Sequence, residues 1–188
     1  MSSAKELHQS GISQFRAGNT TGALAKLQEA LAAAPENSRL QAEIYNDLGV
    51  VYRELKDYDA AFNALDEAMA IFNELEDARG QAQALGNLGA LLEAEEDYEA
   101  AVNSYKQSAK MLEELGESEM AMYVWQAISR LRTRQGQYIA AIGAYEEGVE
   151  NMPKGFKRSA LEKLLKMPGK LLGGAAPPPA KANDNDET

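Results

Sequence analysis

Residues 48–68 read LGVVYRELKDYDAAFNALDEA, and a related segment, LGALLEAEEDYEAAVNSYKQS, follows forty positions later at residues 88–108. The two segments share a leucine-glycine start, an Asp-Tyr pair at their centre and alanines at matching positions. Self-similarity at a fixed period of 20–50 residues is the sequence signature of a repeat architecture. The sequence therefore predicts a stack of similar units.

The same register extends in both directions and gives four copies. Each copy has a small residue in the same local setting, at intervals of 38, 40 and 40 residues, and an alanine twelve residues further on. The small residues are Gly11, Gly49, Gly89 and Ser129, and the alanines are Ala23, Ala61, Ala101 and Ala141. A glycine inside a helix costs about 1 kcal/mol relative to alanine, so its repetition indicates a point where two helices approach closely.

Each copy contains two apolar-periodic segments joined by a short polar break, such as ELKDY at 54–58 or AEEDY at 94–98. Apolar residues spaced three and four apart on both sides of a break are typical of a helix hairpin. The pattern predicts an all-α chain. We expect its helices at about 3–16, 20–33, 38–55, 58–75, 78–95, 98–115, 117–135 and 138–151.

The order of small residue, alanine, tyrosine and closing proline resembles the tetratricopeptide repeat. The second copy carries the resemblance best, through Tyr45, Leu48, Gly49, Tyr52, Tyr58, Ala61, Leu65 and Ala68. The resemblance implies a right-handed αα-superhelix of four repeats, at about 4–37, 42–75, 82–115 and 122–153. The first copy departs from the pattern at Ser10 and Gln14, and the fourth departs at Ser129 and Arg132.

The copies are about 40 residues long, whereas the usual tetratricopeptide repeat has 34. This longer form resembles the adaptor and peptide-sensing proteins that are typified by regulators with Leu-Gly-Asn repeats. The tripeptide Asn87-Leu88-Gly89 carries that similarity. The extra residues are expected to lengthen the helices.

The composition argues against an enzyme and against metal or cofactor binding. The 188 residues include no cysteine and one histidine, His8, which we expect on the surface. Thiolate and paired-histidine metal sites are therefore excluded, and a Ser-His-Asp triad is hard to build. The acidic run around Glu93, Glu95, Glu96 and Asp97 is interpreted as a solvated turn, and no glycine-rich phosphate loop follows a strand.

The formal net charge of −10 argues against nucleic acid as a partner, because phosphate binding needs a dense basic surface. The N-terminus has no apolar run of the signal-peptide type, and no stretch reaches the roughly 18 apolar residues of a membrane span. We therefore expect a cytoplasmic protein.

Two further segments follow the repeats. Residues 154–172 combine an apolar stripe that includes Phe156, Leu161 and Leu165 with a net charge of +5 over 154–170. They are expected to form a basic amphipathic helix that covers the open face of the last repeat. The alternative is that this helix docks on a membrane surface or mediates self-association to a homo-oligomer. Residues 173–188 are rich in proline and polar residues and are expected to be disordered.

The candidate binding site follows from helix geometry. At about 100° per residue, positions three before, one after and four after each small residue lie on the side away from the core. In the resembling family this inner face binds another protein or peptide. The candidate groove residues at these positions are Ile12, Phe15, Asn46, Val50, Arg53, Glu93, Gln126 and Arg130, and Asn87 and Arg134 are candidates at the edges of the groove.

These residue types suit a protein ligand. Asparagine amides can bond to a peptide backbone of any sequence, arginines can bind carboxylates, and the three apolar side chains could hold an apolar anchor. The sequence thus predicts a non-catalytic adaptor or assembly factor that holds a peptide or partner segment in a groove. The alternative is a scaffold that acts through the basic C-terminal helix.

Overall fold

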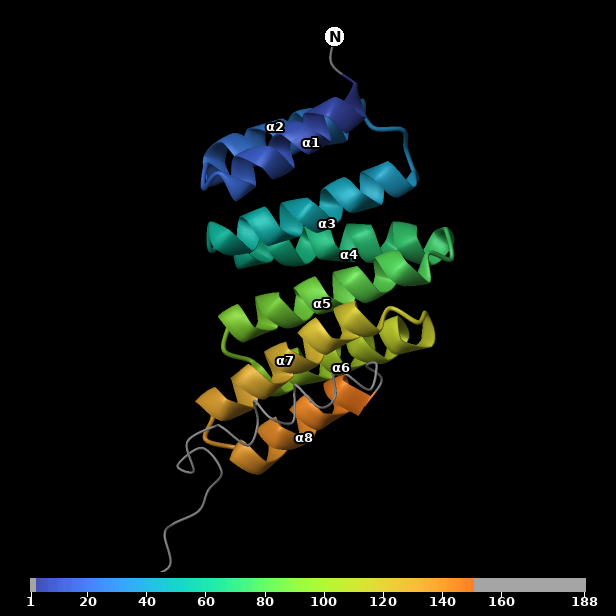
Figure 1. The fold of residues 1–188 in the computed structure, drawn as a ribbon. Helices are drawn as coiled ribbons and strands as arrows, with labels where there is room; N and C mark the ends of the chain where they lie inside the picture. The colour runs from blue at the N-terminus through green and yellow to red at the C-terminus, as the bar shows by residue number, and fades with distance from the viewer. Residues whose placement is uncertain (1–2, 151–188) are drawn as a thin grey trace, which may run out of the picture.

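The computed structural model describes residues 3–150, and every regular element within that range is an α-helix (Figure 1). The helices are α1 (Ala4–Arg16), α2 (Thr20–Ala33), α3 (Arg39–Glu54), α4 (Tyr58–Glu74), α5 (Ala78–Ala94), α6 (Tyr98–Glu114), α7 (Ser118–Arg134) and α8 (Tyr138–Glu150). From α1 to the start of α8, every helix end lies within one residue of its predicted position, and the predicted end of α8 at residue 151 lies outside the described residues. The predicted capping helix at 154–172 and the tail at 173–188 lie outside the described residues.

The forty-residue period follows from the uniform lengths of the helices and of the turns between them. From α4 to α7 each helix has 17 residues, and three residues separate it from the next one. In each of these four turns, and in the turn before α4, the middle residue has a positive φ, and these residues lie one helix and one turn apart, at Lys56, Glu76, Glu96, Gly116 and Gly136. The extra length of the repeat is therefore helix, as the sequence predicted.

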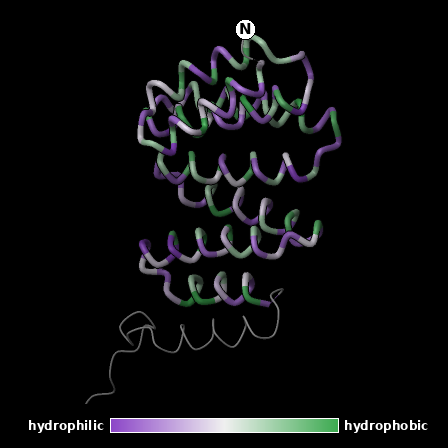
Figure 2. The backbone as a smooth tube through the Cα atoms, turned by 45° about the horizontal axis from the view of Figure 1, so that its top comes forward, coloured by the Kyte–Doolittle hydropathy of each residue, from purple (hydrophilic) through white to green (hydrophobic). Residues whose placement is uncertain are grey.

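In three of these turns, the residue that follows the positive-φ residue is an aspartate that caps the next helix. The side chains of Asp57, Asp77 and Asp97 each accept a hydrogen bond from a backbone N–H in the first turn of α4, α5 and α6. Such caps stabilise a helix by about 1 kcal/mol each. Hydrophobic and hydrophilic residues alternate along the helices that these caps begin (Figure 2), so each helix packs along one stripe.

The recurring small residues lie at the closest approach within each helix pair, which confirms the packing reason inferred from the sequence. A Cβ atom built on Gly49 would lie 2.7 Å from Leu65 Cγ, and one built on Gly89 would lie 2.7 Å from Tyr105 Cδ1. In the fourth pair Ser129 replaces glycine and uses its hydroxyl at this contact, donating to the Ala141 carbonyl at 2.8 Å.

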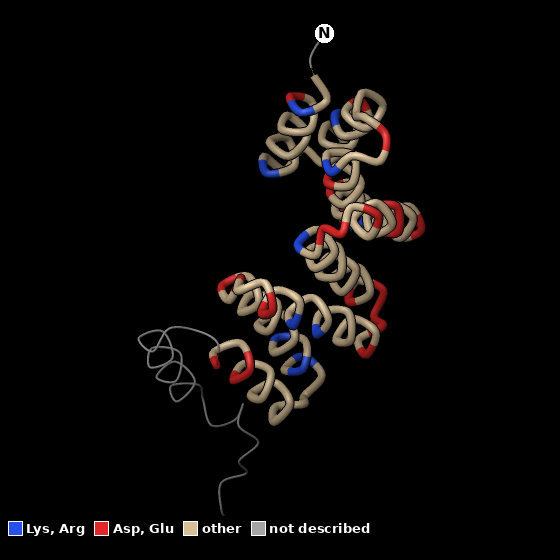
Figure 3. Tube along the Cα trace, turned by 90° about the vertical axis from the view of Figure 1, so that its right-hand side faces the viewer, with Lys and Arg blue, Asp and Glu red and all other residues tan. Residues whose placement is uncertain are grey.

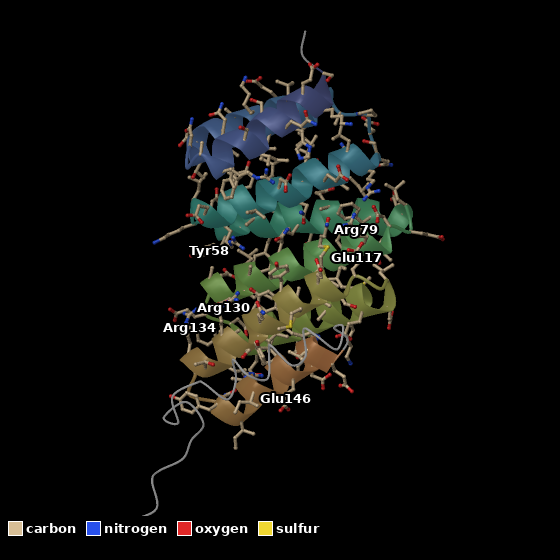
Figure 4. The ribbon with its side chains drawn as sticks, viewed as in Figure 1. Tyr58, Arg79, Glu117, Arg130, Arg134 and Glu146 are labelled. Atoms are coloured by element: carbon tan, nitrogen blue, oxygen red, sulfur yellow. The ribbon has the colours of Figure 1, made fainter. Side chains whose placement is uncertain are left out.

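Successive helix pairs are also tied together at the edge where the odd-numbered helices begin. Arg39 Nε of α3 lies 3.2 Å from Asp77 Oδ2, and Arg79 Nε of α5 lies 3.0 Å from Glu117 Oε1. Glu117 makes no side-chain cap bond to α7, and its carboxylate pairs with Arg79 (Figure 4).

A third connection explains a departure from the family pattern. Arg132 stands where the repeat usually has tyrosine, and its guanidinium donates to both carboxylate oxygens of Glu99 on α6, at 2.5 and 3.0 Å. The hydrogen bond from Arg132 holds the pKa of Glu99 below its ordinary value. Arg132 therefore links α6 and α7 by an ion pair at this position.

The helix pairs stack into a bent solenoid. Figure 1 looks onto the face formed by α1, α3, α5 and α7, and the side view of Figure 3 shows the stack bending with this face on its hollow side. The second helix of each pair packs against the first helix of the next pair, which builds a continuous core. The hollow side is where a site for another polypeptide is expected.

Candidate functional site: two pockets on the hollow face

Neighbouring odd-numbered helices are joined by polar contacts across the hollow face. His8 Nε2 of α1 lies 2.7 Å from Asp47 Oδ2 of α3, and Asn87 Nδ2 of α5 donates to Asn46 Oδ1 of α3 at 2.9 Å. Both contacts link the position three before one small residue to the position two before the next. His8 is only 7% exposed, so the expectation of a surface histidine is wrong. Its ring is buried because it serves this contact between repeats.

The third contact of this series is missing, and a recess opens in its place. The equivalent residues are Gly86 of α5 and Ala127 of α7, neither of which has a side chain that can bond. The backbone of α5 lies close to α3, whereas α5 and α7 are further apart. The recess has a volume of about 490 Å³, and its lining includes Asn46, Asn87, Gly86, Tyr105, Leu112, Tyr123, Val124 and Ala127.

A second pocket of about 410 Å³, which we call the arginine pocket, lies near the other end of α5. Its lining consists of Arg53, Ala90, Glu93, Ala94, Glu96, Tyr98 and Arg134. Glu93 lies in the middle of its polar groups and accepts hydrogen bonds from Arg134 Nη1 at 2.6 Å and from the Tyr105 hydroxyl at 3.2 Å. Figure 4 shows Arg130 and Arg134 at the same end of α7.

Tyr105 connects the two pockets, and its surroundings favour the neutral phenol. Burial raises the pKa of Tyr105 well above its ordinary value of 10.0, and the charge of Glu93 and its hydrogen bond raise it further. The guanidinium groups of Arg53 and Arg130 act in the opposite direction with smaller effect. The phenol is therefore a fixed hydrogen-bond donor to Glu93 at neutral pH.

This shift predicts a loss of stability at high pH. Below pH 10 the phenol is protonated in both the folded and the unfolded chain, so its contribution is complete. As the pH rises above 10 the unfolded phenol ionises first, and the free energy of unfolding falls. We expect Tyr105→Phe to show a smaller loss than the native chain in urea unfolding between about pH 9 and pH 11. An identical pH dependence in both proteins would contradict this.

The ten predicted groove residues fall into four groups. Asn46 and Asn87 line the recess, and Arg53, Glu93 and Arg134 line the arginine pocket. Phe15 packs partly against the core between α2 and α3. Ile12, Val50, Gln126 and Arg130 line neither pocket, although Arg130 lies close enough to Tyr105 to affect its pKa.

The acidic run at 93–97 is more than the solvated turn that the sequence suggested. Glu93 bonds to Arg134 and Tyr105, and Asp97 caps α6.

The structure also places residues in the recess that the sequence analysis did not select, above all Tyr123. It is 70% exposed, the most exposed aromatic side chain among the described residues. Tyr123 and Gln83 lie six residues before Ser129 and Gly89, one helical turn beyond the last position that we considered. Extending the inner stripe by that turn would have identified both.

Within residues 3–150 we find no group of three or more histidine, aspartate or glutamate side chains arranged to hold a metal ion. None of the described helices is long and apolar enough to cross a membrane.

Comparison with known families agrees with this geometry. The tetratricopeptide repeat family model matches residues 4–74 and again residues 40–114, which together cover more than half of the chain. The chain therefore belongs to the tetratricopeptide repeat family. Members of this family are generally non-catalytic scaffolds for protein interaction. The matched residues include α1 to α6, and α7 and α8 extend the same packing beyond the match.

Solved structures show the same fold at low sequence identity. BtubC from P. vanneervenii is 17% identical with a TM-score of 0.70, and the alignment covers 98% of this chain and 70% of that one. A putative kinesin light chain with nearly identical TPR-like repeats from Podospora anserina is 14% identical with a TM-score of 0.70, covering 90% and 86%.

A third neighbour has a partner bound. The Rap protein complexed with competence and sporulation factor is 20% identical with a TM-score of 0.76, and the alignment covers 90% of this chain and 48% of that one. This chain thus spans about half of the Rap chain. The comparison with curated proteins gave no significant match.

Proposed function

We propose that this protein is an adaptor that holds a segment of a partner protein on its hollow face, with the recess as the principal contact. The recess is the observation on which this proposal rests. It is a mostly apolar depression between α5 and α7 with a nearby exposed tyrosine, and it lies where a contact between repeats is replaced by Gly86 and Ala127. Tyrosine and other aromatic side chains contribute a disproportionate share of the binding energy at protein interfaces.

The polar groups beside the recess suit a peptide backbone. Asn46 and Asn87 bond to each other, yet the pair keeps further amide N–H groups and a carbonyl oxygen that can bond to a ligand. An extended segment could therefore bond through its main chain to this pair while one of its side chains enters the recess. The complex of the Rap protein with competence and sporulation factor supports a peptide or protein as the class of ligand.

The test is affinity capture with recess variants. The tagged protein is incubated with an extract of its native cells, and the retained proteins are identified by mass spectrometry. We expect Tyr123→Ala combined with Ala127→Phe to reduce capture of the principal partner at least about tenfold, because the first change removes an aromatic contact and the second fills the recess. The circular dichroism spectrum should stay unchanged.

Ile139→Ala is the matched control. Ile139 is 85% exposed on α8 and lines neither pocket, so its loss removes a similar exposed apolar side chain from another place. Equal capture by the recess variant and the native chain would contradict the proposed function. So would an equal loss of capture in the Ile139→Ala control.

The alternative, self-association or membrane docking through residues 154–172, depends on residues outside the described range and stays a prediction. Deletion of 154–188 tests it. If the full-length protein forms oligomers or binds acidic vesicles and the deletion abolishes this behaviour, residues 154–188 have a role beyond the predicted cap.

A further inference from the structure

We infer that the hollow face selects an extended segment in which an aspartate or glutamate lies three residues from a large apolar residue. This inference rests on the proposed function and adds the chemistry of the ligand. The apolar residue enters the recess, and the carboxylate binds Arg53 and Arg130.

The arginines in and beside the arginine pocket favour an anionic group. Arg53 and Arg134 line the pocket together with Glu93 and Glu96, and Arg130 lies outside the lining, beside Arg134 on α7 (Figure 4) and near enough to Tyr105 to act on it. Glu93 is already bonded to Arg134 and to Tyr105. Among the described residues, neither Arg53 nor Arg130 forms an ion pair. Two guanidinium groups therefore remain available on this part of the hollow face, in a chain whose net charge is −10.

Glu93 forms no hydrogen bond or ion pair with Arg53 or Arg130. Its two oxygens accept from different donors, Oε1 from Arg134 and Oε2 from Tyr105. An arginine that binds a carboxylate does so with parallel N–H groups in a fixed plane, so a ligand carboxylate between Arg53 and Arg130 gains both charge and geometry. A neutral amide of the same shape offers neither charge nor a second acceptor oxygen.

The recess supplies the apolar half of the motif. Its lining includes Leu112, Val124 and Ala127 together with the ring of Tyr105, so an aliphatic or aromatic side chain can be buried there. No charged side chain except Asp47 lines it. An acidic ligand residue would lose its hydration in the recess and would meet only Asp47, which carries a charge of the same sign.

The separation of three ligand residues follows from the distance between the two pockets, which can be measured along α5 because both pockets include residues of this helix. The α5 residues of the recess run from Ala82 to Asn87, and those of the arginine pocket run from Ala90 to Ala94. Their midpoints are between seven and eight residues apart, which is about 11 Å at 1.5 Å per residue of helix. An extended peptide advances about 3.3 Å per residue, so three residues span about the same distance. The order of the two ligand residues is left to the experiment.

An array of defined peptides tests this with the full-length protein. Each peptide carries one leucine or phenylalanine and one aspartate or glutamate in a neutral serine and alanine frame, at separations of one to six residues and in both orders. We expect the strongest binding at a separation of three in one order. Replacing the acid with asparagine or glutamine in the best peptide should weaken binding about tenfold in fluorescence anisotropy.

Two sets of variants assign the effect to the two pockets. Arg53→Gln with Arg130→Gln should bind the acidic peptide and its amide counterpart equally, whereas Ala127→Phe should weaken both. The control is Lys106→Gln with Lys110→Gln, which removes the same charge from exposed positions on α6 and should keep the preference for the acid. Raising the ionic strength should weaken only the acidic peptide.

The outcomes separate this inference from the proposed function. Equal binding of acidic and amide peptides, a best separation other than three, or no binding by any peptide would overturn the inference. Partner capture that depends on Tyr123 and Ala127 but not on Arg53 and Arg130 would leave the proposed function standing without it. Capture that depends on none of these residues would remove both.

Discussion

Gly49→Val should lower the free energy of unfolding by at least about 2 kcal/mol. A Cβ at this position lies 2.7 Å from Leu65 Cγ and 3.4 Å from the Ala61 carbonyl oxygen, and valine adds two methyl groups beyond it. Leu65 is only 3% exposed and cannot move aside without disturbing the core around it. Helix α3 must therefore move away from α4. Urea unfolding followed by circular dichroism measures the loss.

The same change at Gly143 of α8 is the control. Among the described residues, no atom outside its chain neighbours and the adjacent backbone of α8 lies within 4 Å of a Cβ built there, so close packing should have no effect. Glycine is a poorer helix former than valine by a few tenths of a kcal/mol, so Gly143→Val should leave stability unchanged or slightly raised. A similar loss in both variants would mean that valine is unfavourable in these helices wherever it is placed, and would contradict close contact between helices as the reason for the recurring glycines.

Leu91→Ala should cost about 2–5 kcal/mol, the range for a fully buried leucine. Its side chain on α5 is 0% exposed and packs with Ala61 and Leu65 of α4, so it joins the second helix pair to the third. The loss combines the missing transfer free energy with the cavity left behind. Chemical unfolding should show it as a lower midpoint, and a broader transition would indicate that the two halves of the stack no longer unfold together.

Leu75→Ala is the matched control for this prediction. Leu75 follows α4 directly and is 43% exposed, so its truncation removes little buried area. We expect a loss below about 1 kcal/mol. Comparable losses at Leu75 and Leu91 would contradict the view that the core between helix pairs carries the stability of the stack.

The fold could be predicted because repetition reports the same contact four times. A single glycine in a helix is ambiguous, but Gly11, Gly49 and Gly89 in the same register indicate one recurring helix contact, and the matching alanines identify its other side. The helix ends followed because the capping aspartates and the polar breaks recur with them. A repeat also makes departures informative, as Ser129 and Arg132 show through the bonds that they form.

The candidate site could be predicted only in part. Helix geometry assigns residues to the inner face, and it placed Asn46, Asn87 and Arg53 beside the two pockets. It could not reveal that the two asparagines bond to each other or that Glu93 bonds to Arg134. Those contacts depend on how neighbouring repeats are positioned relative to one another. The recess itself is created by two residues without functional groups, Gly86 and Ala127, and a search for chemically active side chains passes over such positions.

The uniform turns have a consequence for how this chain could change in length. The block at 57–96 begins with the capping residue Asp57 and ends with Glu96, which has a positive φ. If the block were copied in tandem, Glu96 would be followed by Asp57, the same pair of conformations that already joins Glu96 to Asp97. Gene duplication can therefore extend this molecule by whole units without inventing a new junction, and each added unit brings another stretch of inner wall on which new specificity can arise.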